Sequence, residues 1–108
     1  MMIEKPDLNL FTDDALWELV RKANREALMA IYDRYSPNLY IYIIQIISTR
    51  IRGKQLEEDT REILILVFET LWTNRRRLPR TIHLEDHLFT QAYQHALNYG
   101  GLNKLKNQ

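Results

Sequence analysis

Apolar residues recur every three or four positions between Thr12 and Tyr35, which is the spacing of a helix with one buried face. The apolar positions are Leu16, Leu19, Val20, Ala23, Ala27, Leu28 and Ile31. Thr12 or Asp13 offers a short side-chain oxygen that can accept the free amides of a first helical turn. The pattern therefore predicts one amphipathic helix from this point to Tyr35, with Ser36-Pro37 breaking it and starting the next segment.

The second segment runs from Leu39 to Arg52 and is apolar at nearly every position. Its β-branched and aromatic residues suit a strand, whereas a helix of this composition must be central and apolar almost all round. The local pattern leaves both structures open. Gly53-Lys54-Gln55 ends the segment in either case.

The third segment, from about Leu56 to Arg77, contains six consecutive apolar residues at positions 63–68. In a helix most of them share one broad side with Leu71 and Trp72, but Ile65 and Leu66 point the other way. Two interpretations of this outward pair remain open. Either the N-terminal segment covers it, using Leu8, Leu10 and Phe11, or a partner or a second copy of the chain does.

A fourth helix is predicted from about His83 to Tyr99, with Gly100-Gly101 as its stop. Its inward positions are Leu84, Leu88, Phe89, Ala92, Ala96 and Tyr99. The expected domain organisation is a flexible lead-in at residues 1–12, a helical domain at residues 13–101 and a frayed tail at residues 102–108.

Composition indicates a single globular domain. The chain has 108 residues, with 27% charged and 45% hydrophobic side chains, and its net charge of +1 predicts no strong attraction to nucleic acid or an acidic membrane. The absence of cysteine excludes disulfides and thiolate metal ligands. No apolar run approaches the ~20 residues of a membrane span, so a cytoplasmic protein is expected.

Two polar clusters bear on function. Arg75, Arg76, Arg77 and Arg80 form the dense basic cluster, which is either a solvated helix end or a site of phosphate contact. His83 and His87 have a spacing that can share a metal on one helix face, but the order is not that of a zinc protease motif. We see no acid–base pair with catalytic logic, so we expect neither an enzyme nor a metal site nor a cofactor.

Several short stretches, taken in order, resemble region 2 of bacterial sigma factors of the extracytoplasmic-function class. They are EALMAIYDRY at 26–35 with Leu39-Tyr40, VFETLW at 67–72 with the turn at 75–78, and HLF at 87–89 with Ala92 and LNY at 97–99. The resemblance covers roughly residues 13–104. It implies that the ambiguous second segment is helical and that the fold class is all-α, a compact bundle of about four helices.

The resemblance also implies a function: binding of core RNA polymerase and capture of the −10 promoter element in transcription initiation. The polymerase-binding residues would be Glu62, Ile65, Leu66 and Glu69. The DNA-binding residues would be Arg76, Arg77, Arg80, Tyr93, Gln94 and Asn98. The family carries a second, helix-turn-helix domain that this length cannot hold, so the chain is expected to be a fragment or a shortened relative.

The working surfaces depart from the family pattern. Ile65 and Leu66 stand where relatives usually present Gln and Glu to polymerase, and no Lys or Arg occurs from Thr81 to Asn103 on the DNA-facing stretch. The alternative function is therefore a degenerate sigma-like interaction module without promoter binding. An anti-sigma factor or self-association would then account for the apolar pair.

Overall fold

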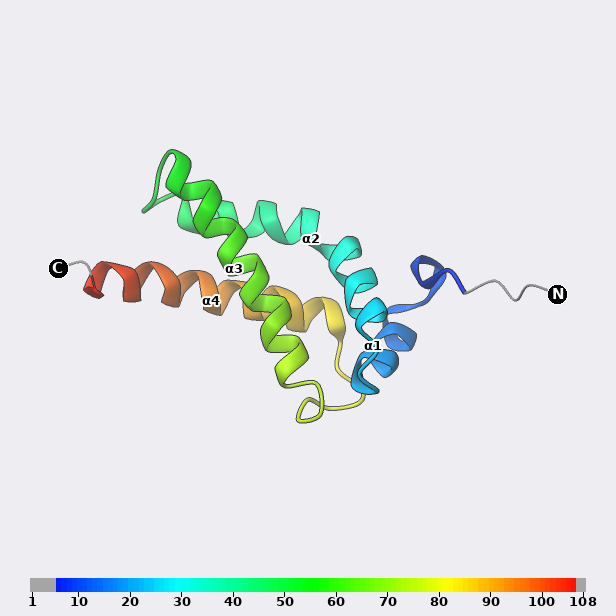
Figure 1. The fold of residues 1–108 in the computed structure, drawn as a ribbon. Coiled ribbons are helices and arrows are strands. Elements are labelled where there is room, and N and C mark those ends of the chain that lie inside the picture. Colours follow the sequence, from blue (N-terminus) through cyan, green and yellow to red (C-terminus); the bar gives the residue numbers. More distant parts are fainter. Residues whose placement is uncertain (1–5, 107–108) are drawn as a thin grey trace.

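The computed structural model describes the backbone of residues 6–106 and side chains from Pro6 to Tyr99, and the regular secondary structure of this part is all helical. A short 3-10 helix, η1 (Leu8–Leu10), precedes the four α-helices α1 (Asp13–Arg21), α2 (Arg25–Ile47), α3 (Lys54–Thr73) and α4 (Leu84–Lys106). No strand occurs between residues 6 and 106. The all-α prediction is confirmed, and the strand alternative for the second segment is wrong (Figure 1).

The predicted helix from Thr12 to Tyr35 is two helices. α1 ends in a turn in which the amide of Ala23 donates to the carbonyl of Val20 and that of Asn24 to Leu19. Ala23 takes the left-handed conformation at φ 68°, a position that glycine usually fills. Asn24 then caps α2 by accepting from the amide of Ala27 at 3.0 Å. Alanine is a strong helix former, so the sequence pattern did not reveal that α1 ends at this point and that α2 begins after Asn24.

The prediction that Pro37 breaks the helix is wrong: α2 continues through Pro37 to Ile47. A proline within a helix removes one backbone hydrogen bond and forces its ring against the preceding turn. Buried residues on both sides, among them Ile31 and Leu39, hold the helix together across this point. Figure 1 shows α2 bent midway along its length.

The ends of the last two helices also differ from the prediction. α3 ends at Thr73, so Arg75 to Arg77 lie in the following turn and not in the helix. α4 passes through Gly100-Gly101 and extends to Lys106. The predicted stop at the two glycines is therefore wrong, and residues 102–106 belong to the helix; residues 107–108 of the expected tail lie outside the described part.

α2 is the central element and packs against the other three α-helices, while α3 and α4 also pack against each other. The core consists of buried aliphatic residues from all four helices, together with Trp17 and Phe68. The indole nitrogen of Trp17 donates to the carbonyl of Pro79 at 3.2 Å, which ties α1 to the turn before α4. Tyr42 of α2 packs edge-on against Phe89 of α4, with ring centroids 5.1 Å apart.

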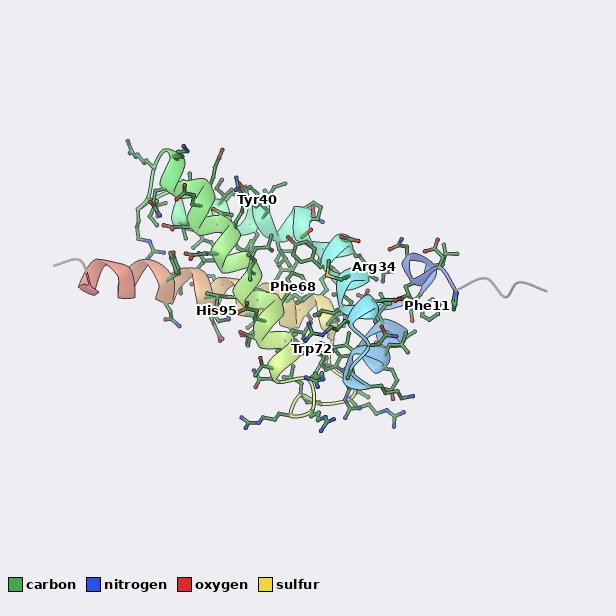
Figure 2. All side chains as sticks on the ribbon, viewed as in Figure 1. Phe11, Arg34, Tyr40, Phe68, Trp72 and His95 are labelled. Carbon is green, nitrogen blue, oxygen red and sulfur yellow. The ribbon has the colours of Figure 1, made fainter. Side chains whose placement is uncertain are left out.

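The N-terminal segment is fastened to α2 and not to α3. The guanidinium of Arg34 donates to Asp13 at 2.7 Å and to the carbonyl of Phe11 at 2.7 Å (Figure 2). The hydroxyl of Tyr35 also donates to Asp13, and burial together with this hydrogen bond raises the pKa of the phenol well above its usual value. From residue 6 onward, the predicted flexible lead-in therefore includes an ordered turn at Leu8–Leu10.

Candidate interaction surfaces

The outward side of α3 carries the four residues predicted to bind polymerase. Ile65 is 50% exposed, Glu62 and Glu69 are exposed and Leu66 is partly buried. Together with Tyr99 of α4 they line a hollow of about 260 Å³. The structure thus brings all four predicted residues to one surface. We refer to Glu62, Ile65, Leu66 and Glu69 as the α3 outer face.

The N-terminal segment from Pro6 to Thr12 does not cover the α3 outer face. Leu8 and Phe11 pack against the core, and η1 makes its contacts with α2. Leu10, a further residue offered as cover, is 82% exposed. The covering interpretation is therefore wrong for the described part of this segment, and Ile65 remains half open to solvent.

Tyr99 fixes the acidic edge of the α3 outer face. Its hydroxyl lies 3.0 Å from Asp59 Oδ1 and also within hydrogen-bonding range of the Glu62 carboxylate. Asp59 is only 4% exposed and accepts a second hydrogen bond from Gln55 at 2.7 Å. Glu62 is therefore held toward α4, at the edge of the hollow that Ile65 also lines.

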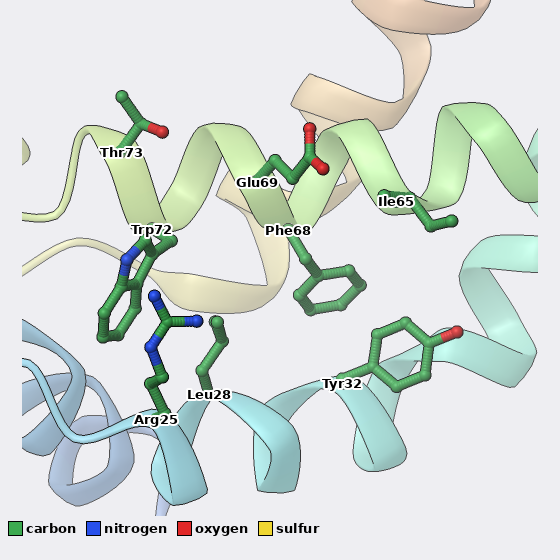
Figure 3. Close-up of a pocket in the computed structure, with 8 residues that line it drawn as sticks. All are labelled: Arg25, Leu28, Tyr32, Ile65, Phe68, Glu69, Trp72 and Thr73. Carbon is green, nitrogen blue, oxygen red and sulfur yellow. The ribbon is translucent and has the colours of Figure 1, made fainter.

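A groove of about 390 Å³ lies between α2 and α3, on the other flank of Ile65 (Figure 3). It is lined by Arg25, Leu28 and Tyr32 from α2 and by Ile65, Phe68, Glu69, Trp72 and Thr73 from α3. Tyr32 and Phe68 meet edge to face, with ring centroids 4.9 Å apart. We call this the α2–α3 groove. Sequence reasoning missed it because its two walls are some forty residues apart in the chain, although Trp72 was placed on the inward side of its helix.

The basic cluster does not act as one unit. Arg76 and Arg77 are exposed, whereas Arg80 pairs with Glu18 at 3.2 Å. Arg75 lies over the Trp72 ring at 4.2 Å from its centroid and donates to the Trp72 carbonyl at 2.9 Å. Only two of the three arginines predicted to contact DNA are therefore without a carboxylate partner among the described residues.

The predicted DNA-binding residues of α4 are exposed. Tyr93 is 47% exposed, and Gln94 and Asn98 are exposed as well. At 1.5 Å per residue, Tyr93 and Asn98 lie about 14 and 21 Å along the axis from the start of α4. Arg76 and Arg77 lie in the turn that follows α3, so the predicted DNA-binding residues come from two elements.

The histidines do not assemble a metal site. His83 pairs with Asp86 at 3.2 Å, while burial lowers the pKa of His87. His95 shares a hydrogen bond with Thr70 at 3.2 Å, and burial lowers its pKa as well. Among the side chains from Pro6 to Tyr99, no three His, Asp or Glu residues stand close enough to hold a metal ion.

The fold thus defines an all-α helical bundle with two adjoining surfaces on α3, the α3 outer face and the α2–α3 groove. No protein-family model matches this chain, and no curated protein and no solved structure shows significant similarity to it. None of the helices has both the length and the apolar content to cross a membrane, within the residues that the structure describes.

Proposed function

We propose that this chain is a sigma factor region 2-like domain that binds core RNA polymerase through the α3 outer face. The observation that carries the proposal is Ile65, a large aliphatic side chain half exposed at the centre of that surface, between Glu62 and Glu69. Apolar residues at the centre of a polar rim are the usual anatomy of a protein interface. The proposed action is binding, with no chemical reaction.

Two features support a protein partner for this face. An exposed aliphatic side chain gains roughly 1.5–3 kcal/mol when an interface buries it, and truncating such a central residue has the largest effect on affinity. In the resemblance to sigma factors, Ile65 and Leu66 stand at the positions whose side chains contact polymerase in that family. Here the contact would be apolar, with Glu62 and Glu69 supplying the polar rim.

The test is a binding titration of the purified chain against bacterial core RNA polymerase. Ile65→Glu places a charge in the centre of the proposed contact and is expected to weaken binding at least about tenfold, because an unpaired charge is costly to bury. Ile41→Glu is the matched control, since Ile41 is similarly exposed on α2 and lines neither of the two surfaces on α3. Wild-type protein that does not bind core polymerase contradicts the function, and equal binding by the two variants contradicts the surface.

Capture of the −10 promoter element is a second candidate, favoured by exposed Tyr93, Gln94 and Asn98 on α4. An aromatic ring can stack on an unpaired base and the two amides can hydrogen-bond to base edges. Arg76 and Arg77, from the turn after α3, would contribute phosphate contacts. A fluorescence anisotropy titration with −10 single-stranded DNA at low salt tests this candidate, because phosphate contacts are strongest there.

The alternative is an interaction module that binds protein and not promoter DNA. Support for it comes from the lack of any Lys or Arg between Thr81 and Asn103 and from the pairing of Arg80 with Glu18. Polymerase binding without measurable low-salt DNA binding selects this alternative. Salt-sensitive DNA binding that Arg76→Ala weakens selects promoter capture.

A further inference from the structure

Trp72, at one end of the α2–α3 groove, carries two guanidinium groups over its indole: that of Arg25, which lines the groove, and that of Arg75, which lies outside the lining. Arg25 lies 4.8 Å and Arg75 4.2 Å from the centroid of the Trp72 ring. Within the part of the chain that the structure describes, neither arginine pairs with a carboxylate within 4.0 Å. Stacking on an aromatic ring leaves the N–H groups at the edges of a guanidinium available to an acceptor. This end of the groove is therefore a ready site for a carboxylate.

The rest of the groove is mostly apolar, with Glu69 and Thr73 as its further polar residues. Leu28, Tyr32 and Phe68 form its centre, and Ile65 stands at the end opposite Trp72 (Figure 3). A volume of about 390 Å³ lies at the small end of the range for ligand sites, and an open groove of this size suits one or two large side chains. From Ile65 to Trp72 is two helical turns, about 10 Å of axis. A bound segment of matching length would be roughly two turns of helix.

We propose that the α2–α3 groove binds an acidic amphipathic peptide. Its apolar side chains would lie over Leu28, Tyr32 and Phe68, and its carboxylate would accept hydrogen bonds from Arg25. Carboxylates favour such charge-assisted contacts with guanidinium groups. This inference goes beyond the proposed function, because it requires neither polymerase nor DNA.

The distribution of charge gives the bound peptide a direction. Glu69 lines the middle of the groove, between Ile65 and Trp72, and Glu62 lies beyond the Ile65 end, on the α3 outer face. Glu62 repels an acidic residue at the Ile65 end, whereas Arg25 attracts one at the Trp72 end. A nucleic-acid strand would set phosphates along the whole groove, including beside Glu69, so the charges favour a peptide over a nucleic acid.

A random peptide-display library of about a dozen residues per peptide tests the inference without assuming a sequence. Peptides are selected on the wild-type chain after removal of those that bind the Arg25→Glu variant. Arg25 is the first residue of α2, where an acidic side chain suits the helix dipole, so this variant is expected to fold, as its melting temperature would verify. The expected survivors combine acidic residues with aromatic or aliphatic residues at helical spacing. Basic survivors, or none above background, overturn the inference.

The affinity of the strongest survivor is then measured by fluorescence titration. Arg25→Glu is expected to weaken binding about tenfold or more, since it replaces a charge-assisted contact by repulsion. Arg52→Glu changes the net charge equally from an exposed position outside the groove and is expected to have at most about a twofold effect. An equal loss in both variants shows that only net charge matters and contradicts the site.

A charge reversal of the peptide completes the test. Replacing its critical acidic residue by lysine is expected to abolish binding to the wild-type chain and to restore binding to the Arg25→Glu variant. If the reversed peptide gains nothing on the variant, the assigned contact is wrong. Arg25 lies outside the α3 outer face, so a failure here leaves the polymerase result unchanged and the two proposals fail separately.

Discussion

Both sides of α3 carry apolar residues, but those on the inner side are buried and one on the outer side is half exposed. The inner side places Ile63, Val67 and Leu71 in complete burial against α2 and α4. The outer side offers Ile65, which is half exposed at the edge of the α2–α3 groove and is flanked by Glu62 and Glu69. The comparison teaches that six consecutive apolar residues need not all belong to one core. Inner residues stabilise the fold, whereas an exposed outer residue is accessible for contact with another molecule.

The strongest test of this contrast is truncation on the inner side. Leu71→Ala removes a fully buried side chain and leaves a cavity, which should lower the free energy of unfolding by about 2–5 kcal/mol. Ile65→Ala is the matched change on the outer side and should lower it by no more than about 0.5 kcal/mol. Urea denaturation of both variants measures the difference. Equal losses would mean that Ile65 is part of the core in solution.

Tyr99→Phe tests the link between buried Asp59 and Glu62 of the α3 outer face, and its expected effect on stability is intermediate. The change removes the hydroxyl that contacts Asp59 and Glu62 and so leaves the buried Asp59 carboxylate with Gln55 as its remaining partner. Stability should fall by about 1–2 kcal/mol, the cost of one lost hydrogen bond to a buried charged group. Thermal unfolding measures the effect. Unchanged stability would show that the Tyr99 hydroxyl does not stabilise the buried Asp59 side chain.

The smallest expected effect is a pH dependence of the free energy of unfolding, which arises from two histidines on α4. Burial lowers the pKa of His95, which shares a hydrogen bond with Thr70, and also that of His87. The unfolded chain therefore binds protons more readily, so stability is complete above about pH 6.5 and decreases as the pH falls below it. Denaturation midpoints at pH 7.5 and 5.0 should show this decrease.

His95→Gln provides the control for that pH dependence. Glutamine can keep a polar contact with Thr70 but does not titrate, so the decrease in stability between pH 7.5 and 5.0 should become smaller. Stability that rises on acidification of the wild-type chain would have the wrong sign for both histidines. An unchanged decrease in the variant would assign it to His87 or to other groups.

The spacing of apolar residues predicted the all-α fold only in combination with the resemblance, and it placed Ile65 correctly on the outward side. It did not locate the helix boundaries. Ala23 favours a helix in general but ends α1 here, where Asn24 caps the next helix. Pro37 disfavours a helix but lies inside α2, because the buried residues on both sides of it hold the helix in place. The α2–α3 groove depends on Arg25 meeting Trp72, a contact between distant parts of the chain that periodicity does not encode.

The bend of α2 at Pro37 has a consequence for how the molecule comes apart. The first half of α2 holds the N-terminal segment through Arg34, and the second half packs on α4 through Tyr42. One continuous element thus belongs to both ends of the bundle, and neither end can melt alone without disrupting a helix that the other requires. Calorimetry should accordingly register a single cooperative transition, with the enthalpy from the peak area equal to the van't Hoff value.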